Sequence, residues 1–139
     1  ILDLYAGTGS FGLECLSRQA GSVCFVEKSN DARKILEKNI EKLKVKKNAY
    51  IFLDDVFDLI KRDSIFKSKF DLIFCDPPFK DSNIEKLIQL ICNNNVLQKD
   101  GILILHRNIN TKEKLPNYFK IIDERLYGIS KITFGKFLS

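Results

Sequence analysis

The chain lacks methionine altogether, and none of its apolar runs approaches the length of a membrane span. It has 139 residues and no Met, whereas a transmembrane helix needs roughly 18 or more consecutive apolar residues. No secretory or lipidation signal is recognisable. The sequence opens at Ile1, already inside a strand-like run. We therefore expect a cytoplasmic protein without membrane contact, from which an N-terminal segment is missing.

Residues that commonly bind metals are also scarce. Cys15, Cys24, Cys75 and Cys92 form no CxxC pair, and His106 is the only histidine. Structural zinc sites need clustered thiolates or imidazoles. The sequence therefore predicts no metal site, and the cysteines are expected to be buried and reduced, as is typical of intracellular proteins.

Positive charge, in contrast, is in excess. The formal net charge is +5 at pH 7, which suits a polyanionic partner such as nucleic acid. The composition is also rich in Lys, Ile, Asn and Phe, as an AT-biased genome would give. The charge alone therefore does not establish nucleic-acid binding.

Apolar runs alternate with amphipathic segments along the whole chain. Strands are expected over 1–6, 22–27, 49–53, 70–75, 101–106, 119–127 and 130–137, and helices over 11–19, 29–44, 56–62 and 83–94. Gly21 is expected to end the first helix as its C′ glycine, and Ser29 or Asn30 to cap the second. This alternation predicts a doubly wound, mostly parallel α/β sheet that closes in a β-hairpin near Gly128. No linker or repeat interrupts it, so we expect one domain over 1–139.

A glycine-rich loop follows the first expected strand. Gly7, Gly9 and Gly12 have the spacing of the dinucleotide-binding fingerprint. Glycines permit a tight turn and a close approach of the backbone to a ligand. Glu27, at the end of the second strand, could accept hydrogen bonds from ribose hydroxyls. NAD binding is therefore one interpretation of this loop.

Two carboxylates argue against NAD. Asp3 stands four residues before Gly7, where it can bond into the loop and face an ammonium group, but would repel a pyrophosphate. Asp76 opens the tetrapeptide DPPF (76–79) at the end of the fourth expected strand. Ligands of such sheets bind at the carboxyl ends of the strands. Both motifs should therefore border one crevice.

The tetrapeptide itself suits a planar amine. Asp76 and Pro77 each precede a proline, which keeps them extended, and the two prolines have no N–H. The Asp76 carboxylate and the Pro77 carbonyl can therefore accept hydrogen bonds from an amino group, while Phe79 offers a ring for base stacking. Two such acceptors would stabilise the positive charge that develops on an amine nitrogen as it attacks a methyl group.

The sequence resembles S-adenosylmethionine-dependent methyltransferases. DLYAGTGSFG (3–12) is similar to their motif I, and DPPF is similar to motif IV of those that methylate planar amino groups. The stretches GSVCFVEKS, NNNVLQKDGILIL and RLYGISKITFGKF extend the resemblance to the bacterial 16S ribosomal RNA guanine-N2 methyltransferases that act on guanine 966. It implies a seven-stranded Rossmann-like sheet whose last strand is antiparallel, and S-adenosylmethionine as cofactor. The implied substrate is ribosomal RNA or a small-subunit assembly particle, and the expected enzyme is a monomer.

The resemblance also assigns roles to residues. The implied cofactor-binding residues are Asp3, Tyr5, Gly7 and Gly9 for the methionine part, Glu27 for the ribose, and Asp55 and Val56 for the adenine. The implied catalytic residues are Asp76, Pro77, Pro78 and Phe79. Plainer interpretations stay open; Asp55, for example, can cap the helix that begins at Val56.

The substrate is less well defined than the cofactor. Asp76 does not choose between guanine N2 and adenine N6, although release-factor glutamine methyltransferases usually carry Asn-Pro-Pro-Tyr instead. An adenine-N6 methyltransferase acting on DNA or RNA, and a non-catalytic RNA-binding remnant of the fold, remain alternatives.

The segment after the fifth strand departs from the family. Relatives often carry Glu or Glu-His there, where this chain has LHRN (105–108). His106 could approach the site, but we favour a neutral histidine, exposed or packed, at this position. Six cations near strand ends are expected to be solvated surface charges or, in part, phosphate contacts: Lys80, Arg107, Lys112, Lys114, Arg125 and Lys131.

Overall fold

Strands and helices alternate along the chain as the sequence predicts. The computed structural model describes residues 1–62, 66, 70–80 and 83–138. The strands are β1 (Leu2–Leu4), β2 (Val23–Glu27), β3 (Ala49–Leu53), β4 (Phe70–Cys75), β5 (Leu97–Asn108), β6 (Phe119–Tyr127) and β7 (Ser130–Phe137). The helices are α1 (Ser10–Ser17), α2 (Asn30–Leu43), α3 (Val56–Lys61) and α4 (Ile84–Asn93), with a 3-10 turn, η1, at Lys46–Asn48.

The strands form one seven-stranded sheet in the order β3-β2-β1-β4-β5-β7-β6. The first five strands pair in parallel, and β7 is antiparallel to both β5 and β6. This confirms the predicted α/β class and the antiparallel C-terminal hairpin. The order of strands in the sheet changes direction at β1: β2 and β3 lie on one side of it, and β4 and β5 on the other. Such a switch point leaves a crevice at the carboxyl ends of the strands.

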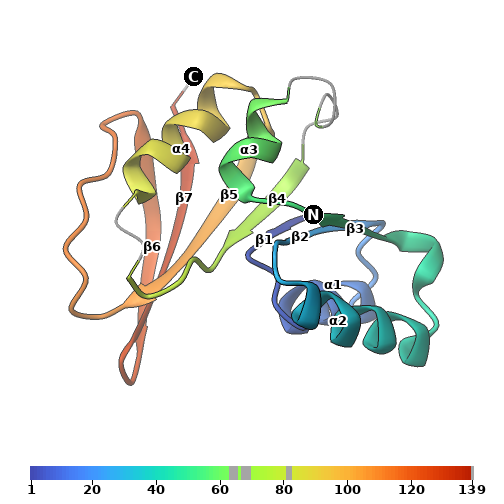
Figure 1. Cartoon of the computed structure of the whole chain (residues 1–139). Coiled ribbons are helices and arrows are strands. Elements are labelled where there is room, and N and C mark those ends of the chain that lie inside the picture. Colours follow the sequence, from blue (N-terminus) through green and yellow to red (C-terminus); the bar gives the residue numbers. More distant parts are fainter. Residues whose placement is uncertain (63–65, 67–69, 81–82, 139) are drawn as a thin grey trace.

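Helices cover both faces of the sheet, and each face has its own core. Figure 1 shows α3 and α4 on one face, whereas α1 and α2 lie against β1–β3 on the other. Leu2 and Leu4 are fully buried with α3 and α4, and Phe25 is fully buried with α1 and α2. Successive strand residues point to opposite faces, so Asp3 lies on the α1 side.

Three predicted boundaries shift for local reasons. β1 ends at Leu4, because Tyr5 adopts a left-handed φ of +59°. α1 ends at Ser17 rather than Gln19, in a Schellman motif in which Ala20 N–H donates to the Cys15 carbonyl at 3.0 Å. Gln19, with φ of +74°, holds the left-handed position predicted for Gly21. β5 begins earlier than predicted because it pairs with β4 from Leu97 onward, across a register shift.

β6 is one of the two edge strands, opposite β3, and after Phe119 all of its residues are exposed. A register shift between Ile121 and Asp123 interrupts its pairing with β7. Bulges and charged side chains on an edge discourage pairing with a second sheet. Within the described residues, no helix combines the length and apolarity needed to cross a membrane.

Candidate functional site

The glycine loop turns sharply between β1 and α1. Gly7 and Gly9 have positive φ angles of +58° and +92°, a conformation that favours glycine. Gly9 also precedes α1 as its N-cap residue. A Cβ on Gly12 would lie 2.3 Å from the Phe25 ring. The loop therefore needs glycine for backbone shape at two positions and for close packing at the third.

The buried Asp3 side chain holds the glycine loop through a hydrogen bond. Its side chain is 1% exposed, and its Oδ2 accepts a hydrogen bond from the Gly12 amide at 3.1 Å. Burial raises the pKa of the Asp3 carboxyl from 3.8 to about 7, with Asp76 and Glu27 adding repulsion and the Gly12 bond opposing both. The Asp3 carboxylate is thus costly to ionise unless a cation comes close.

Glu27, at the end of β2, connects two backbone segments. Its Oε1 accepts a hydrogen bond from the Gly7 amide at 2.8 Å, and its Oε2 accepts one from the Ser29 amide at 2.7 Å. Ser29 in turn caps α2, as predicted, by accepting from Ala32 N–H. Carboxylate oxygens hold two lone-pair positions each, so Glu27 can also accept from a ligand.

Asp55 and Val56 lie where the chain leaves β3. Asp55 accepts a hydrogen bond from the Asp58 amide at 3.1 Å and so caps α3. Val56, the first residue of that helix, is 3% exposed. The capping interpretation of Asp55 is therefore correct, and it leaves the second carboxylate oxygen for a ligand.

A pocket of about 210 Å³ joins these elements. Its lining comprises Tyr5, Val26, Glu27, Lys28, Asp54, Asp55, Val56, Asp76 and Pro78. Four carboxylates and one lysine make this lining acidic. A pyrophosphate would be repelled there, whereas a cationic ligand would be attracted.

The tetrapeptide follows β4 at the same edge of the sheet. Pro77 is buried, Pro78 is exposed, and the Phe79 ring is 68% exposed. The Arg107 guanidinium donates a hydrogen bond to the Pro78 carbonyl at 3.2 Å. This contact holds the tetrapeptide against β5.

Arg107 is buried, which contradicts the expectation that it is a surface cation. It is 5% exposed, and its Nε donates to Glu113 Oε1 at 2.6 Å. Arg125 instead pairs with Asp123 and lies over the Phe134 ring, and Lys131 donates to the Thr111 carbonyl at 3.5 Å. Lys80, Lys112 and Lys114 are exposed.

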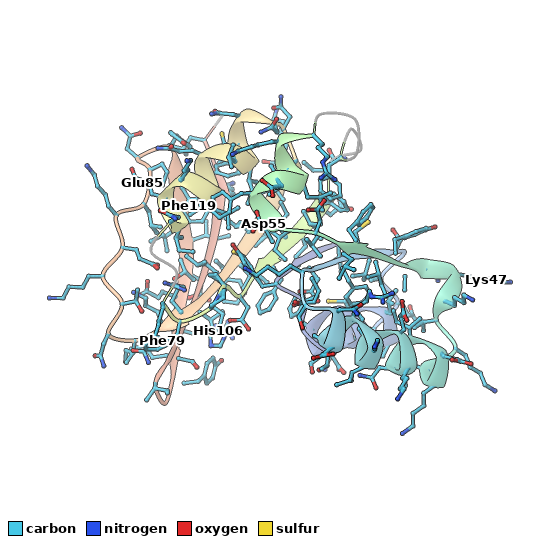
Figure 2. The ribbon with its side chains drawn as sticks, in the orientation of Figure 1. Lys47, Asp55, Phe79, Glu85, His106 and Phe119 are labelled. Atoms are coloured by element: carbon cyan, nitrogen blue, oxygen red, sulfur yellow. The ribbon has the colours of Figure 1, made fainter. Side chains whose placement is uncertain are left out.

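A second pocket, of about 200 Å³, lies on the other side of Asp76. Its lining comprises Asp76, Pro77, Phe79, His106, Arg107, Asn108, Ile129 and Ser130. Figure 2 shows Phe79 and His106 near each other at this end of the sheet. Asp76 therefore lines both pockets, one bordered by the glycine loop and one by the β6–β7 hairpin.

His106 is the site residue that sequence reasoning raised but did not favour. Its Nδ1 lies 3.0 Å from Asp76 Oδ1, and its Nε2 lies 2.9 Å from Ser130 Oγ. No local motif marks either contact. The available signal was position alone, because His106 stands at the end of the strand next to β4.

The four cysteines lie apart from these pockets and are free. Cys75 is buried as expected, whereas Cys15, Cys24 and Cys92 are only half-buried. Burial raises the pKa of each of these three thiols. Thiols with raised pKa values are poor nucleophiles, which fits the expectation of reduced, unreactive cysteines.

Two curated proteins are similar in sequence to most of this chain. Ribosomal RNA small subunit methyltransferase D of Haemophilus influenzae is 33% identical over 129 residues, which cover 92% of this chain and 66% of the relative. The protein of the same name from Buchnera aphidicola is 31% identical over 82% of this chain and 56% of its own length. The chain thus spans a little over half to about two thirds of these curated relatives.

Solved structures and family models agree with this result. A conserved hypothetical protein of Streptococcus pyogenes superposes with a TM-score of 0.87 at 27% identity, covering 96% of this chain and 82% of that one. The family model described as Conserved hypothetical protein 95 matches residues 1–136. The chain therefore belongs to the Conserved hypothetical protein 95 family.

Proposed function

We propose that the protein transfers a methyl group from S-adenosylmethionine to the exocyclic N2 amine of a guanine in small-subunit ribosomal RNA. The observation that carries this proposal is the position of Asp76, which lines both the acidic pocket and the pocket beside Phe79. A group that touches two ligands is where transfer between them can occur. The names of the curated relatives support ribosomal RNA as the substrate class.

The residues of the acidic pocket fit S-adenosylmethionine better than NAD. Glu27 has acceptor positions for ribose hydroxyls, and Asp55 and Val56 offer a carboxylate oxygen and an apolar surface for adenine. Asp3, Tyr5, Gly7 and Gly9 form the turn beside it, where an ammonium group would relieve the burial cost of the Asp3 carboxylate. When bound, S-adenosylmethionine supplies an electrophilic methyl group on a sulfonium centre.

The tetrapeptide would hold the substrate amine. The Asp76 carboxylate accepts a hydrogen bond from the amine N–H and takes up the proton that the nitrogen loses. The Pro77 carbonyl is the second acceptor proposed for the same amine. Pro78 and its bond from Arg107 keep this backbone in place. The exposed Phe79 ring can stack on the base, a contact worth roughly 1–3 kcal/mol.

The base must leave its helix to reach this pocket, because an amine within a stacked duplex is inaccessible. Lys80, Lys112 and Lys114 are exposed near Phe79, and all three line one further hollow of about 390 Å³ together with Phe79. We propose that they contact phosphates that flank the target base.

We also propose that residues 1–139 form one domain that acts as a monomer, in the cytoplasm, on ribosomal RNA or on a small-subunit assembly particle. The interrupted, charged edge of β6 supports the monomer. Sedimentation equilibrium tests it, and a dimer at micromolar concentration would contradict it.

Asp76→Ala tests the transfer step. We expect kcat for methyl transfer to fall by about 10²–10³-fold, the cost of losing one preorganised charge-stabilising group. Affinity for S-adenosylmethionine, measured by calorimetry, should change little. The matched control is Asp71→Ala, at the opposite, exposed end of β4. A wild-type rate in Asp76→Ala would end the proposed mechanism.

The substrate class needs its own experiment. Labelled methyl transfer would be compared on unmethylated small-subunit particles, naked ribosomal RNA, DNA and a release factor. We expect label in RNA only, at guanine N2. Label in adenine would favour the adenine-N6 alternative, and tight RNA binding without transfer would favour the non-catalytic remnant. Calorimetry with NAD should give no binding; NAD binding would favour an oxidoreductase.

A further inference from the structure

His106 lies between Asp76 and the β6–β7 hairpin. It is on β5, opposite Ile132 of β7, and its two ring nitrogens contact Asp76 Oδ1 and Ser130 Oγ at 3.0 and 2.9 Å. Both partners line the pocket beside Phe79. The imidazole side chain is 32% exposed and the Asp76 side chain 44% exposed. A half-exposed carboxylate has rotational freedom unless a partner fixes it.

The chemistry of the three groups determines where the protons lie. An ionised carboxylate only accepts hydrogen bonds, so His106 Nδ1 must carry the proton that it donates to Asp76. In the neutral imidazole Nε2 is then an acceptor, and the Ser130 hydroxyl donates to it. The Asp76 carboxylate thereby selects the Nδ1–H tautomer, and the Ser130 hydroxyl adapts to it and holds the ring in place.

We propose that His106 is a positioning residue for methyl transfer, which orients the Asp76 carboxylate toward the substrate amine and whose ring is itself held in place by Ser130. The proposal rests on the proposed function of Asp76. With Oδ1 bonded to His106, the amine would be received by Oδ2, which has no partner among the described residues.

Two substitutions separate the two ring nitrogens. His106→Asn places an amide N–H near the position of Nδ1, whereas His106→Gln places its amide near the position of Nε2. We expect His106→Asn to keep kcat within about threefold of wild type. His106→Gln should lose at least tenfold in kcat, and Ser130→Ala should lose less than His106→Gln. Cofactor affinity should stay the same in all three.

Nuclear magnetic resonance gives a readout that needs no substrate. His106 is the only histidine in the chain, so nitrogen-15 imidazole spectra of untagged protein report this ring alone. We expect the Nδ1–H tautomer in the wild type and a mixture of tautomers in Asp76→Ala, because alanine cannot accept the Nδ1 proton. Observing the Nε2–H tautomer in the wild type, or no change in Asp76→Ala, would overturn the proposal.

The two proposals fail in different ways. If wild-type protein transfers no methyl group to any nucleic acid, the proposed function fails, whatever the imidazole spectra show. If transfer occurs and His106→Gln is as active as His106→Asn, the positioning role is wrong and the proposed function stands.

Discussion

The two halves of the sheet contribute to the site in different ways. On the β1–β2–β3 half, carboxylates bond to backbone amides of the loops: Asp3 to Gly12, nine residues away, and Glu27 to Ser29 and Gly7, two and twenty residues away. On the β4–β5–β7 half, side chains reach across the sheet. His106 meets Asp76 and Ser130 over separations of 30 and 24 residues, and Arg107 meets Pro78 over 29.

Some contacts of the site are specified by a local sequence motif, and others by the register in which the strands pair. A glycine loop specifies its own geometry, so its residues can be recognised together. A cross-strand contact exists only once β5 is aligned with β4 and β7, which depends on packing along the whole strand. Predictions for the first half therefore test ligand binding, and predictions for the second half test coupling between distant elements.

The largest effect is expected from Arg107→Met in the second half. Arg107 and Glu113 form an ion pair with side chains only 3% and 14% exposed. Removing one partner leaves the other charge buried, which should lower the free energy of unfolding by about 3–5 kcal/mol. Urea unfolding measures it.

A control from the first half sharpens the comparison. Arg18 pairs with Glu14 at the surface, with side chains 79% and 62% exposed, and Arg18→Met should change stability only slightly. The double change Arg107→Met with Glu113→Gln should recover much of the loss. Equal stability of Arg107→Met and Arg18→Met would contradict a structural role for the buried pair.

Most of the fold followed from local patterns, whereas the C-terminal part of the site did not. The strand alternation, the Ser29 cap and the hairpin near Gly128 were predicted correctly. The prediction that Gly21 ends the first helix was wrong. Gln19 takes the left-handed position instead, and the Ala20 N–H completes the Schellman motif. Glycine preference is a statistical guide, and the hydrogen bonds of a particular turn override it.

Two neighbouring residues show why the rest could not be predicted. His106 and Arg107 are adjacent in sequence, yet one contacts Asp76 and the other is buried against Glu113. Their positions follow from strand alternation, but their partners follow from the fold. Position alone therefore made His106 a weak candidate for the site, and nothing in the sequence removed Arg107 from the surface.

A smaller effect is expected from Glu27→Ala in the first half. The substitution removes the acceptor of the Gly7 and Ser29 amides and the proposed ribose acceptor. Hydrogen bonds to charged groups contribute about 1.5–3 kcal/mol, so affinity for S-adenosylmethionine should fall by roughly 10–100-fold in calorimetry.

The control for Glu27 is a glutamate outside the loop. Glu124→Ala, on the exposed edge strand β6, should leave cofactor affinity unchanged. Glu27→Gln, which keeps an acceptor oxygen but loses the charge, should fall between wild type and Glu27→Ala. Unchanged affinity in Glu27→Ala would remove this residue from the ribose role.

The smallest effect is a pH dependence that arises from Asp3. Burial raises the pKa of its carboxyl from 3.8 to about 7, so in the cofactor-free protein Asp3 is largely protonated below that pH. The folded state then binds a proton that the unfolded state has released, and stability of the cofactor-free protein should decrease as pH rises from about 4 to about 7. Asp3→Asn should remove this decrease, because asparagine does not titrate. Its amide oxygen can still accept the Gly12 hydrogen bond.

Cofactor binding should respond to pH in the opposite sense. An ammonium group beside Asp3 favours the ionised carboxylate, so affinity for S-adenosylmethionine should increase roughly tenfold between pH 5.5 and pH 7, where an α-ammonium remains largely protonated. Calorimetry at several pH values measures the slope, and Asp3→Asn should bind more weakly at pH 7 with no slope. If the slope persists in Asp3→Asn, the titrating group lies elsewhere. Glu27 and Asp76, whose negative charges repel that of Asp3, are then the carboxylates to test next.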